Sequence, residues 1–150
     1  MNAVQVEQKS YEMPPREGFT VAHFLTVADI DRSARFYEKV FGGRILSRGD
    51  SEGAPAYIQI ANTWLLVNVG GGPTPDKPSV TLSVLADPNK ISSFMNIRVA
   101  DIQASYKIWK SRGAEFITEP IPKYGETRCY IRDPDGYIIE VGQSTDLTYG

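Results

Sequence analysis

Glu140 is the residue of this 150-residue chain whose position most clearly calls for a chemical explanation. It stands in the stretch RDPDGYIIEVGQ (132–143), between Ile139 and Val141, in a run that is otherwise apolar. A carboxylate that faces inward from such a strand needs partners, because burying an unpaired charge is costly. We therefore treat Glu140 as a candidate catalytic acid or base and as a candidate metal ligand.

His23 and Cys129 are the single histidine and the single cysteine of the chain. One histidine excludes any site that needs two from the same chain, and no Gly-x-Ser-x-Gly motif accompanies it. One cysteine excludes an internal disulfide and is typical of a reducing compartment, so we expect a cytoplasmic protein. The two residues could pair as nucleophile and base, although a lone thiol in a strand is more commonly part of the core.

The composition narrows the class of partner. The net charge is −2, so there is no basic excess of the kind that binds nucleic acid or an anionic membrane. No apolar run approaches the roughly 18 residues of a membrane span, and the N-terminus has no apolar signal core. We therefore expect neither nucleic acid nor a membrane as a partner.

An internal repeat indicates which elements hold these residues. Segment 26–46 resembles segment 98–117, and the letters VADI recur at 27–30 and 99–102, a spacing of 72 residues. A period this long, seen twice, is typical of a duplicated module rather than of a solenoid.

Each copy predicts the order β-α-β-β-β. Asp29 and Asp101 are expected at helix N-caps, with glycines at the C-terminal ends, and DPDG at 133–136 predicts a tight turn between the last two strands. The expected strands are 19–27, 44–49, 56–61 and 63–69 in the first module, and 91–99, 115–119, 127–132 and 137–143 in the second. We divide one compact domain into a polar arm (1–18), a first module (19–69), a linker (70–90) in which 79–85 could add a short strand, a second module (91–144) and a tail (145–150).

Two motifs carry a resemblance to a known family. DxxxSxxFYxxVFG at 29–42 and DPDGYxIE at 133–140, together with the repeat, resemble the vicinal oxygen chelate superfamily of glyoxalase I, bleomycin resistance proteins and extradiol dioxygenases. The resemblance implies an α+β fold of two βαβββ modules in tandem, whose curled mixed sheets form a cup. It also implies a homodimer, as is common for members of this size.

The resemblance further implies four metal-ligand positions, on the first and last strands of each module. Glu140 matches the last of them. The usual first-strand histidine would fall at Ala22, and its counterpart 72 residues later is Phe94. The remaining position falls on Val67 or Asn68.

His23 lies one residue after the expected histidine position. Strand alternation points it away from the cup unless a β-bulge before Val27 re-aims it. The metal candidates are therefore Glu140 and His23. Since three of the four usual positions are not matched, a divalent metal cofactor remains open.

Alternation also selects candidates for contact with a substrate. They are Phe24 on the first strand and Phe94, Asn96 and Arg98 on the matching strand of the second module. Arg98 could instead pair with Glu140 and neutralise it. Two functions remain open: a lyase-, isomerase- or dioxygenase-type enzyme of unknown substrate, or a metal-free protein that sequesters a small molecule.

Overall fold

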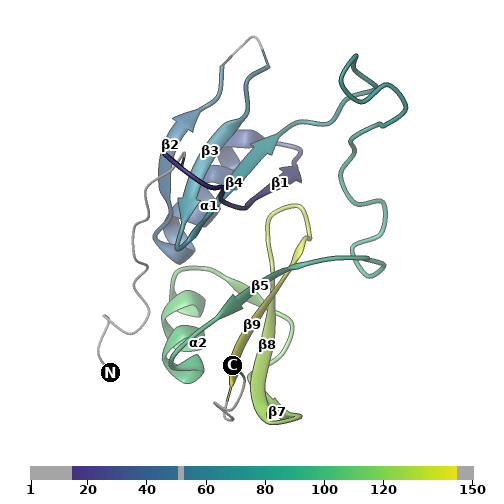
Figure 1. Cartoon of the computed structure of the whole chain (residues 1–150). Coiled ribbons are helices and arrows are strands. Elements are labelled where there is room, and N and C mark those ends of the chain that lie inside the picture. The colour runs from purple at the N-terminus through teal and green to yellow at the C-terminus, as the bar shows by residue number, and fades with distance from the viewer. Residues whose placement is uncertain (1–14, 51–52, 145–150) are drawn as a thin grey trace. The chain divides into compact units, whose positions relative to one another are not determined.

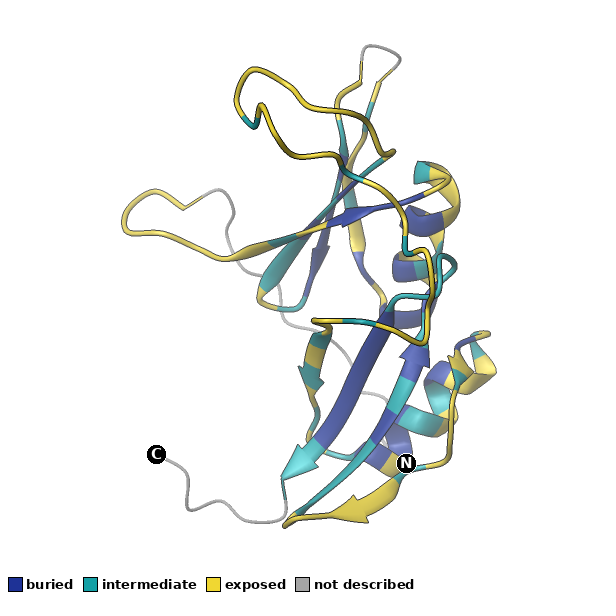
Figure 2. Cartoon of the chain, turned by 90° about the vertical axis from the view of Figure 1, so that its right-hand side faces the viewer, coloured by how far each residue is buried: buried dark blue, intermediate teal, exposed yellow. Residues whose placement is uncertain are grey.

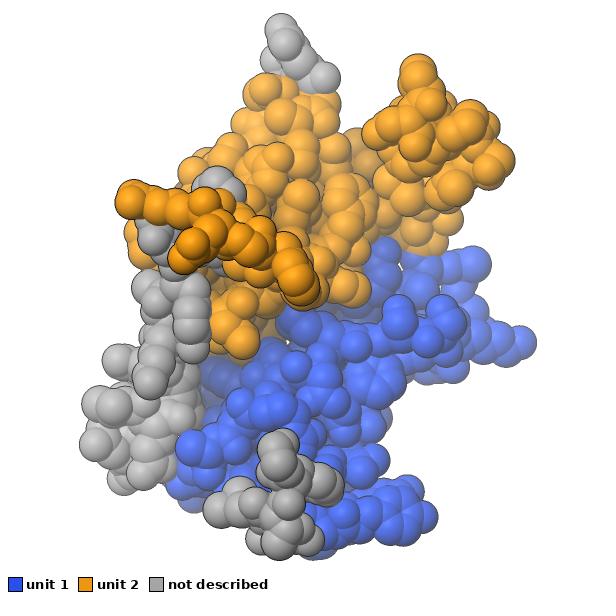
Figure 3. Space-filling view, viewed as in Figure 1, with its two compact units in different colours: residues 1–7, 85–150 blue, residues 8–84 orange. Residues whose placement is uncertain are grey.

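The computed structural model describes residues 15–50 and 53–144, so the tail 145–150 and most of the arm 1–18 lie outside the described residues. The chain divides into two compact units, one ending at Val84 and the other beginning at Leu85 (Figure 3). Within the described residues, each unit contains one mixed sheet and one α-helix (Figure 1).

The first unit holds a four-stranded sheet in the order β1-β4-β3-β2. Its outer strand β1 runs parallel to β4, and the other neighbours are antiparallel. The bounds are β1 Ala22–Thr26, α1 Ile30–Phe41, β2 Arg44–Arg48, β3 Ala56–Ile60 and β4 Thr63–Asn68.

The second unit repeats this arrangement in the order β5-β9-β8-β6, with the additional strand β7 paired to β8. Strand β5 is again parallel to the last strand, β9. The bounds are β5 Met95–Arg98, α2 Ile102–Ser111, β6 Glu115–Phe116, β7 Ile121–Lys123, β8 Glu126–Arg132 and β9 Ile138–Ser144. The predicted α+β fold of two tandem modules is therefore confirmed.

Both helices begin at the predicted aspartates. The side chain of Asp29 accepts a hydrogen bond from the backbone N–H of Arg32 at 3.0 Å, and Asp101 does the same for Ala104 at 3.0 Å. Each bond satisfies an amide that a helix N-terminus otherwise leaves without a partner. Gly42 then ends α1 at φ 71°, a conformation that costs glycine little.

The core of each unit lies between its helix and one face of its sheet. Alternate strand residues are buried on that face, and Figure 2 shows them along the strands and on one side of each helix. Fully buried members include Tyr37, Ile58, Leu65, Val67, Cys129, Ile131, Ile139 and Val141. Within the described residues, neither helix is long and apolar enough to cross a membrane.

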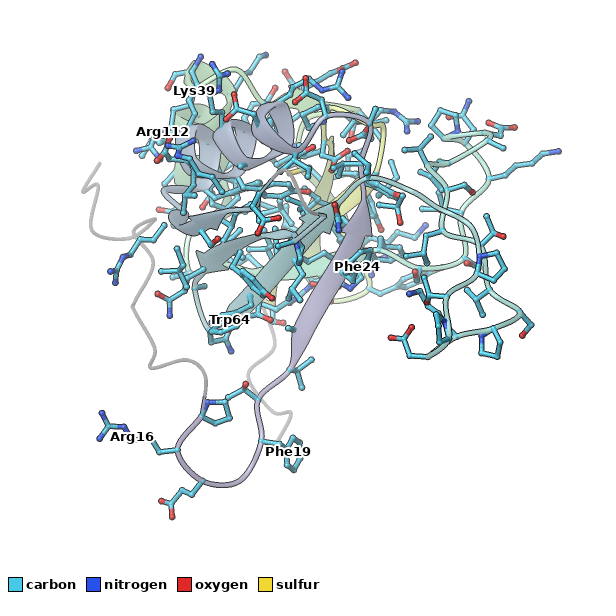
Figure 4. The ribbon with its side chains drawn as sticks, turned by 90° about the horizontal axis from the view of Figure 1, so that it is seen from above. Arg16, Phe19, Phe24, Lys39, Trp64 and Arg112 are labelled. Carbon is cyan, nitrogen blue, oxygen red and sulfur yellow. The ribbon has the colours of Figure 1, made fainter. Side chains whose placement is uncertain are left out.

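Several strand bounds differ from the sequence prediction. The first strand begins at Ala22 rather than at 19, and Phe19 lies on the bend before it, 87% exposed (Figure 4). Strand β6 has only two residues, and the unpredicted β7 occupies part of the segment that follows it. Segment 79–85 contributes a single bridge, Leu82 to Gly71, instead of a strand.

Candidate functional site

Glu140 lies at the centre of β9, on the face of the sheet that points away from α2. The neighbouring Gln143 identifies the opposite face, because its side chain accepts a hydrogen bond from the backbone N–H of Ile102 at the start of α2. Glu140 stands an odd number of residues from Gln143 and therefore faces the other way. In register it sits between Asn96 on β5 and Tyr130 on β8.

We call this surface the outer face of the second sheet. Its polar and aromatic residues come from three adjacent strands and from the residue before β5, and they are Phe94, Asn96, Arg98, Glu126, Arg128, Tyr130, Glu140 and Ser144.

The carboxylate of Glu140 has two partners on neighbouring strands. The amide Nδ2 of Asn96 donates a hydrogen bond to Oε2, and Nε of Arg128 lies 3.6 Å from Oε1. Only 7% of the Glu140 side chain is exposed. A carboxylate this deeply placed is tolerated because it is both hydrogen-bonded and paired with a cation.

The arginine partner differs from the one expected. Arg98, predicted as a partner of Glu140, instead donates two hydrogen bonds to Glu126, at 3.4 and 3.3 Å, and one to the hydroxyl of Ser144 at 3.0 Å. Arg128 then joins the two acidic groups, since its Nε also lies 3.1 Å from Oε1 of Glu126. The four side chains form one continuous ionic cluster across the sheet.

Opposite charges within this cluster favour one another's ionised forms. Hydrogen bonds from Arg98, followed by the charges of Arg98 and Arg128, lower the pKa of Glu126 below its ordinary value. Burial opposes the charged form of Arg128, but Glu126, Tyr130 and Glu140 outweigh it and raise the pKa of that guanidinium. The charged forms of Glu126 and Arg128 are therefore both favoured.

Aromatic rings border the cluster. Phe94 and Tyr130 meet edge to face, with ring centroids 5.9 Å apart. Phe94 remains 44% exposed, although it is a large apolar side chain. The outer face thus places partly exposed aromatic surface beside charged groups.

The first sheet has its own outer face, and the predicted residue Phe24 lies on it. Phe24 is 42% exposed and pairs in register with Leu66 on β4. Trp64 shares this face and meets Tyr57 edge to face at 5.6 Å, with its indole Nε1 buried and without a hydrogen-bond partner in the described part of the chain.

His23 lies on the helix side of its sheet. It pairs with the fully buried Leu65, and the register between β1 and β4 runs without a shift from Ala22 to Thr26. The bulge that would have re-aimed His23 is absent from this described strand pair. His23 therefore faces the opposite side of β1 from Phe24.

The duplicated geometry identifies the fourth metal position. The backbone N–H of Val27 donates to the carbonyl of Asn68 at 2.8 Å, and that of Val99 donates to Gly142 at 2.9 Å. Because Val27 and Val99 are equivalent in the repeat, Asn68 corresponds to Gly142, and the residue that corresponds to Glu140 is Leu66. The position is thus Leu66 rather than Val67 or Asn68.

Asn68 is in any case engaged elsewhere. Its Nδ2 donates to the carbonyl of Gly53 at 2.9 Å, and its Oδ1 accepts from the N–H of Val69 at 2.9 Å. Its amide serves the local backbone.

These residues do not fit a metal ion of the kind that the resemblance implied. The four equivalent positions are Ala22, Leu66, Phe94 and Glu140, and three of these side chains carry no donor atom. Zn²⁺ sites require three or four protein ligands, and harder ions require still more oxygen. Across residues 15–50 and 53–144, no three histidine, cysteine or acidic side chains are grouped to hold a metal ion.

Sequence reasoning missed Glu126 and Arg128. Both lie on β8, directly beside the strand of Glu140. The turn at 133–136 could have revealed them, because it sets the register between β8 and β9. That register places Arg128 opposite Gly142, two residues from Glu140.

Paired modules with the strand order seen here define a fold class that hosts several functions. The chain matches the model of the Glyoxalase/Bleomycin resistance protein/Dioxygenase superfamily over residues 20–141, and it belongs to that family.

Similar proteins span catalysis and binding. A protein of Vibrio cholerae named "Probable lactoylglutathione lyase" is 28% identical over 133 residues, which are 84% of this chain and 91% of that protein. A glyoxalase/bleomycin resistance protein/dioxygenase from Nocardioides has a TM-score of 0.66 at 19% identity, with 90% of this chain and 89% of that one covered. TnmS3 of Streptomyces, an antibiotic binding protein, has a TM-score of 0.59 at 19% identity, with 87% and 98% covered.

Proposed function

We propose that this protein binds a small organic molecule without a metal ion, at the outer face of the second sheet, as a binding or sequestering protein. The observation that carries the proposal is the set of side chains around Glu140 and at the three equivalent positions. The one carboxylate at a ligand position of the family is held by Asn96 and Arg128, while the three equivalent positions are hydrocarbon. The proposal depends on these side chains, since the shared fold alone does not choose between binding and catalysis.

Elemental analysis of the purified protein tests whether the protein binds a metal ion. We expect well below one transition metal per chain, both in the wild type and in Glu140→Gln. A stoichiometric metal in the wild type that is lost in Glu140→Gln would overturn the proposal. Addition of Mn²⁺, Ni²⁺ or Zn²⁺ should leave the melting temperature unchanged, since an ion that does not bind the native state cannot stabilise it.

A compound screen tests the binding part. A ligand that binds the folded protein raises its melting temperature, by an amount that grows with the logarithm of the ratio of ligand concentration to Kd. We expect at least one class of small organic compound to do so and to be recovered chemically unchanged after prolonged incubation. Failure of a broad library to stabilise the protein would contradict the proposal.

A metal-independent enzyme is the second candidate, favoured by the retained Glu140 and by the relative named as a lactoylglutathione lyase. In this case Glu140 would move a proton in a lyase-, isomerase- or dioxygenase-type reaction. Formation of lactoylglutathione is the first activity to assay, with Glu140→Gln as the control. Turnover that the variant abolishes would replace the binding proposal by this one.

Two further properties belong to the same proposal. We infer a homodimer and a cytoplasmic location, the latter from a single cysteine that makes no disulfide. Light scattering of the purified protein tests the first, and fractionation of cells that express it tests the second.

A further inference from the structure

We propose that the outer face of the second sheet selects an organic anion that carries an aromatic ring, with the guanidinium groups of Arg128 and Arg98 binding the oxyanion and the rings of Phe94 and Tyr130 contacting the aromatic part. The inference rests on the proposed function and specifies the chemistry of its ligand. Three features of the site carry it.

The first feature is the depth at which the charges lie. The side chains of Arg98 and Arg128 are 42% and 26% exposed, whereas those of Glu126 and Glu140 are 14% and 7% exposed. The formal charges of the cluster balance, but the positive groups lie nearer to solvent than the negative ones. A ligand that approaches this face therefore meets guanidinium N–H groups before it meets a carboxylate.

The second feature is the supply of donors on Arg128. A guanidinium carries five N–H donors, and the contacts of Arg128 with Glu126 and Glu140 both use Nε. They leave the two terminal nitrogens of the guanidinium clear of both carboxylates, and Tyr130 is a further hydrogen-bond partner of this side chain. Two parallel N–H groups match the two oxygens of a carboxylate or phosphonate.

The third feature is that the arginines are already held in place. Glu126 anchors both of them, at 3.1 Å for Arg128 and at 3.3 and 3.4 Å for Arg98. Ser144 accepts a third hydrogen bond from Arg98 at 3.0 Å. A ligand that binds here restricts the motion of these arginine side chains little further. Binding therefore loses little side-chain entropy, which favours affinity.

The aromatic rings set the length of the ligand. Tyr130 follows Arg128 by two residues on the same face of β8, a separation of roughly 6.8 Å along an antiparallel strand. Phe94 lies beside Tyr130 and leaves nearly half of its surface exposed. A phenyl ring joined to an oxyanion through one or two atoms spans this interval.

Four probes test the inference by NMR titration: phenylacetate, 2-phenylethanol and 2-phenylethylammonium, which are matched in size, and acetate, which lacks the ring. We expect phenylacetate to bind at least fivefold more tightly than the alcohol, and acetate and the ammonium compound to bind most weakly. Raising the salt concentration should weaken phenylacetate and leave the alcohol unchanged, because only the anion gains from charge.

Arg128→Gln and Arg128→Lys locate the effect. We expect about a tenfold loss of phenylacetate affinity in Arg128→Gln and a smaller loss in Arg128→Lys, which keeps the charge but not the planar pair of donors. Arg48→Gln is the matched control, because Arg48 is also an arginine in an ion pair, with Asp31 at 3.3 Å, but lies on β2 of the other unit. It should bind phenylacetate like the wild type.

The two proposals fail in different ways. Tighter binding of the ammonium probe, or unchanged phenylacetate affinity in a folded Arg128→Gln, would overturn this inference while leaving a small-molecule binding protein in place. A protein that binds none of the four probes but is stabilised by other compounds overturns it as well. If no compound of the broader library binds, the proposed function fails first.

Discussion

The guanidinium of Arg98 occupies the space directly above Gly142 that a side chain at that position would fill. A Cβ on Gly142 would collide with Nη1 and with the central carbon of that group. Because Gly142 has no side chain, Arg98 can cross β9 from β5 and reach Glu126 on β8. Gly142 therefore permits the contact of the ionic cluster that reaches across β9, from β5 to β8.

Gly142→Ala should therefore displace Arg98 and leave the rest of the fold unchanged. The obstructing group is the end of a flexible side chain, so Arg98 can swing away, and we expect the melting temperature to fall by only a few degrees. The measurable result is a rise in the pKa of Glu126 towards its ordinary value, followed by carboxyl-detected NMR, because the largest cause of its lowered pKa is the hydrogen bond from Arg98.

Gly72→Ala is the matched control for this prediction, since a Cβ there would meet nothing within 4 Å. It should not change the pKa of Glu126. An unchanged pKa of Glu126 in Gly142→Ala would show that Arg98 does not hold that carboxylate in solution.

The elements of the fold were predictable because their signals are local. An aspartate before an apolar helix, a glycine after it and a DPDG turn each act over a few residues, and the repeat supplied the aspartate and the glycine signals twice. Strand β7 was missed because it is three residues long and contains Pro122, and proline argues against a strand. The first residues predicted for β1 have strand-like types but lie outside the sheet.

The site was only partly predictable. Alternation placed Asn96 and Arg98 on the face of Glu140 correctly, but it could not decide which carboxylate Arg98 reaches. This choice depends on the length of the arginine side chain and on the space above Gly142, which are features of three strands at once. The fourth metal position likewise depended on a gap between the modules that only the paired hydrogen bonds of Val27 and Val99 resolve.

Acid should weaken the ionic cluster in a defined pH range. The pKa of Glu126 is lowered in the folded protein from its ordinary value of 4.5, so its ionised form stabilises the fold above that pH. The contribution is lost as the pH falls below 4.5 and through the lowered folded value, because the unfolded chain takes up the proton first. Denaturation of the wild type and of Glu126→Gln from pH 7 to pH 2 should show a steeper loss in the wild type.

Asp31→Asn controls for acid effects outside the cluster. The pKa of Asp31 is also lowered, chiefly by its hydrogen bond with Arg35, but it lies on α1 of the other unit. This variant should keep the part of the acid slope that Glu126→Gln removes. Equal slopes for the wild type and Glu126→Gln would contradict the role of the cluster.

Cys129 should be an unreactive thiol in the folded protein. It is 1% exposed, and burial raises its pKa from the ordinary 9.0 to about 11, so the nucleophilic thiolate is scarce at neutral pH. A chromogenic disulfide reagent should label it only after denaturation. Rapid labelling of the native protein would mean that β8 opens readily.

The same shift predicts a loss of stability in alkali. Above pH 9 the unfolded chain releases the thiol proton while the folded protein keeps it until about pH 11, so stability falls across this interval. Cys129→Ala should be less stable at pH 8 because of lost packing, but its stability should decline less between pH 9 and pH 11. Parallel pH profiles for the two proteins would refute this.

The two helix caps should contribute similar amounts to stability, since each module uses the same device. Asp29→Ala and Asp101→Ala remove the acceptors of the hydrogen bonds to the backbone N–H groups of Arg32 and Ala104. Each should cost about 1 kcal/mol in the free energy of unfolding, measured by urea denaturation. Asp29→Asn and Asp101→Asn keep a side-chain oxygen at the cap and should lose much less. If the asparagine variants are as unstable as the alanine variants, the loss comes from the charge at the helix N-terminus and not from the capping bond.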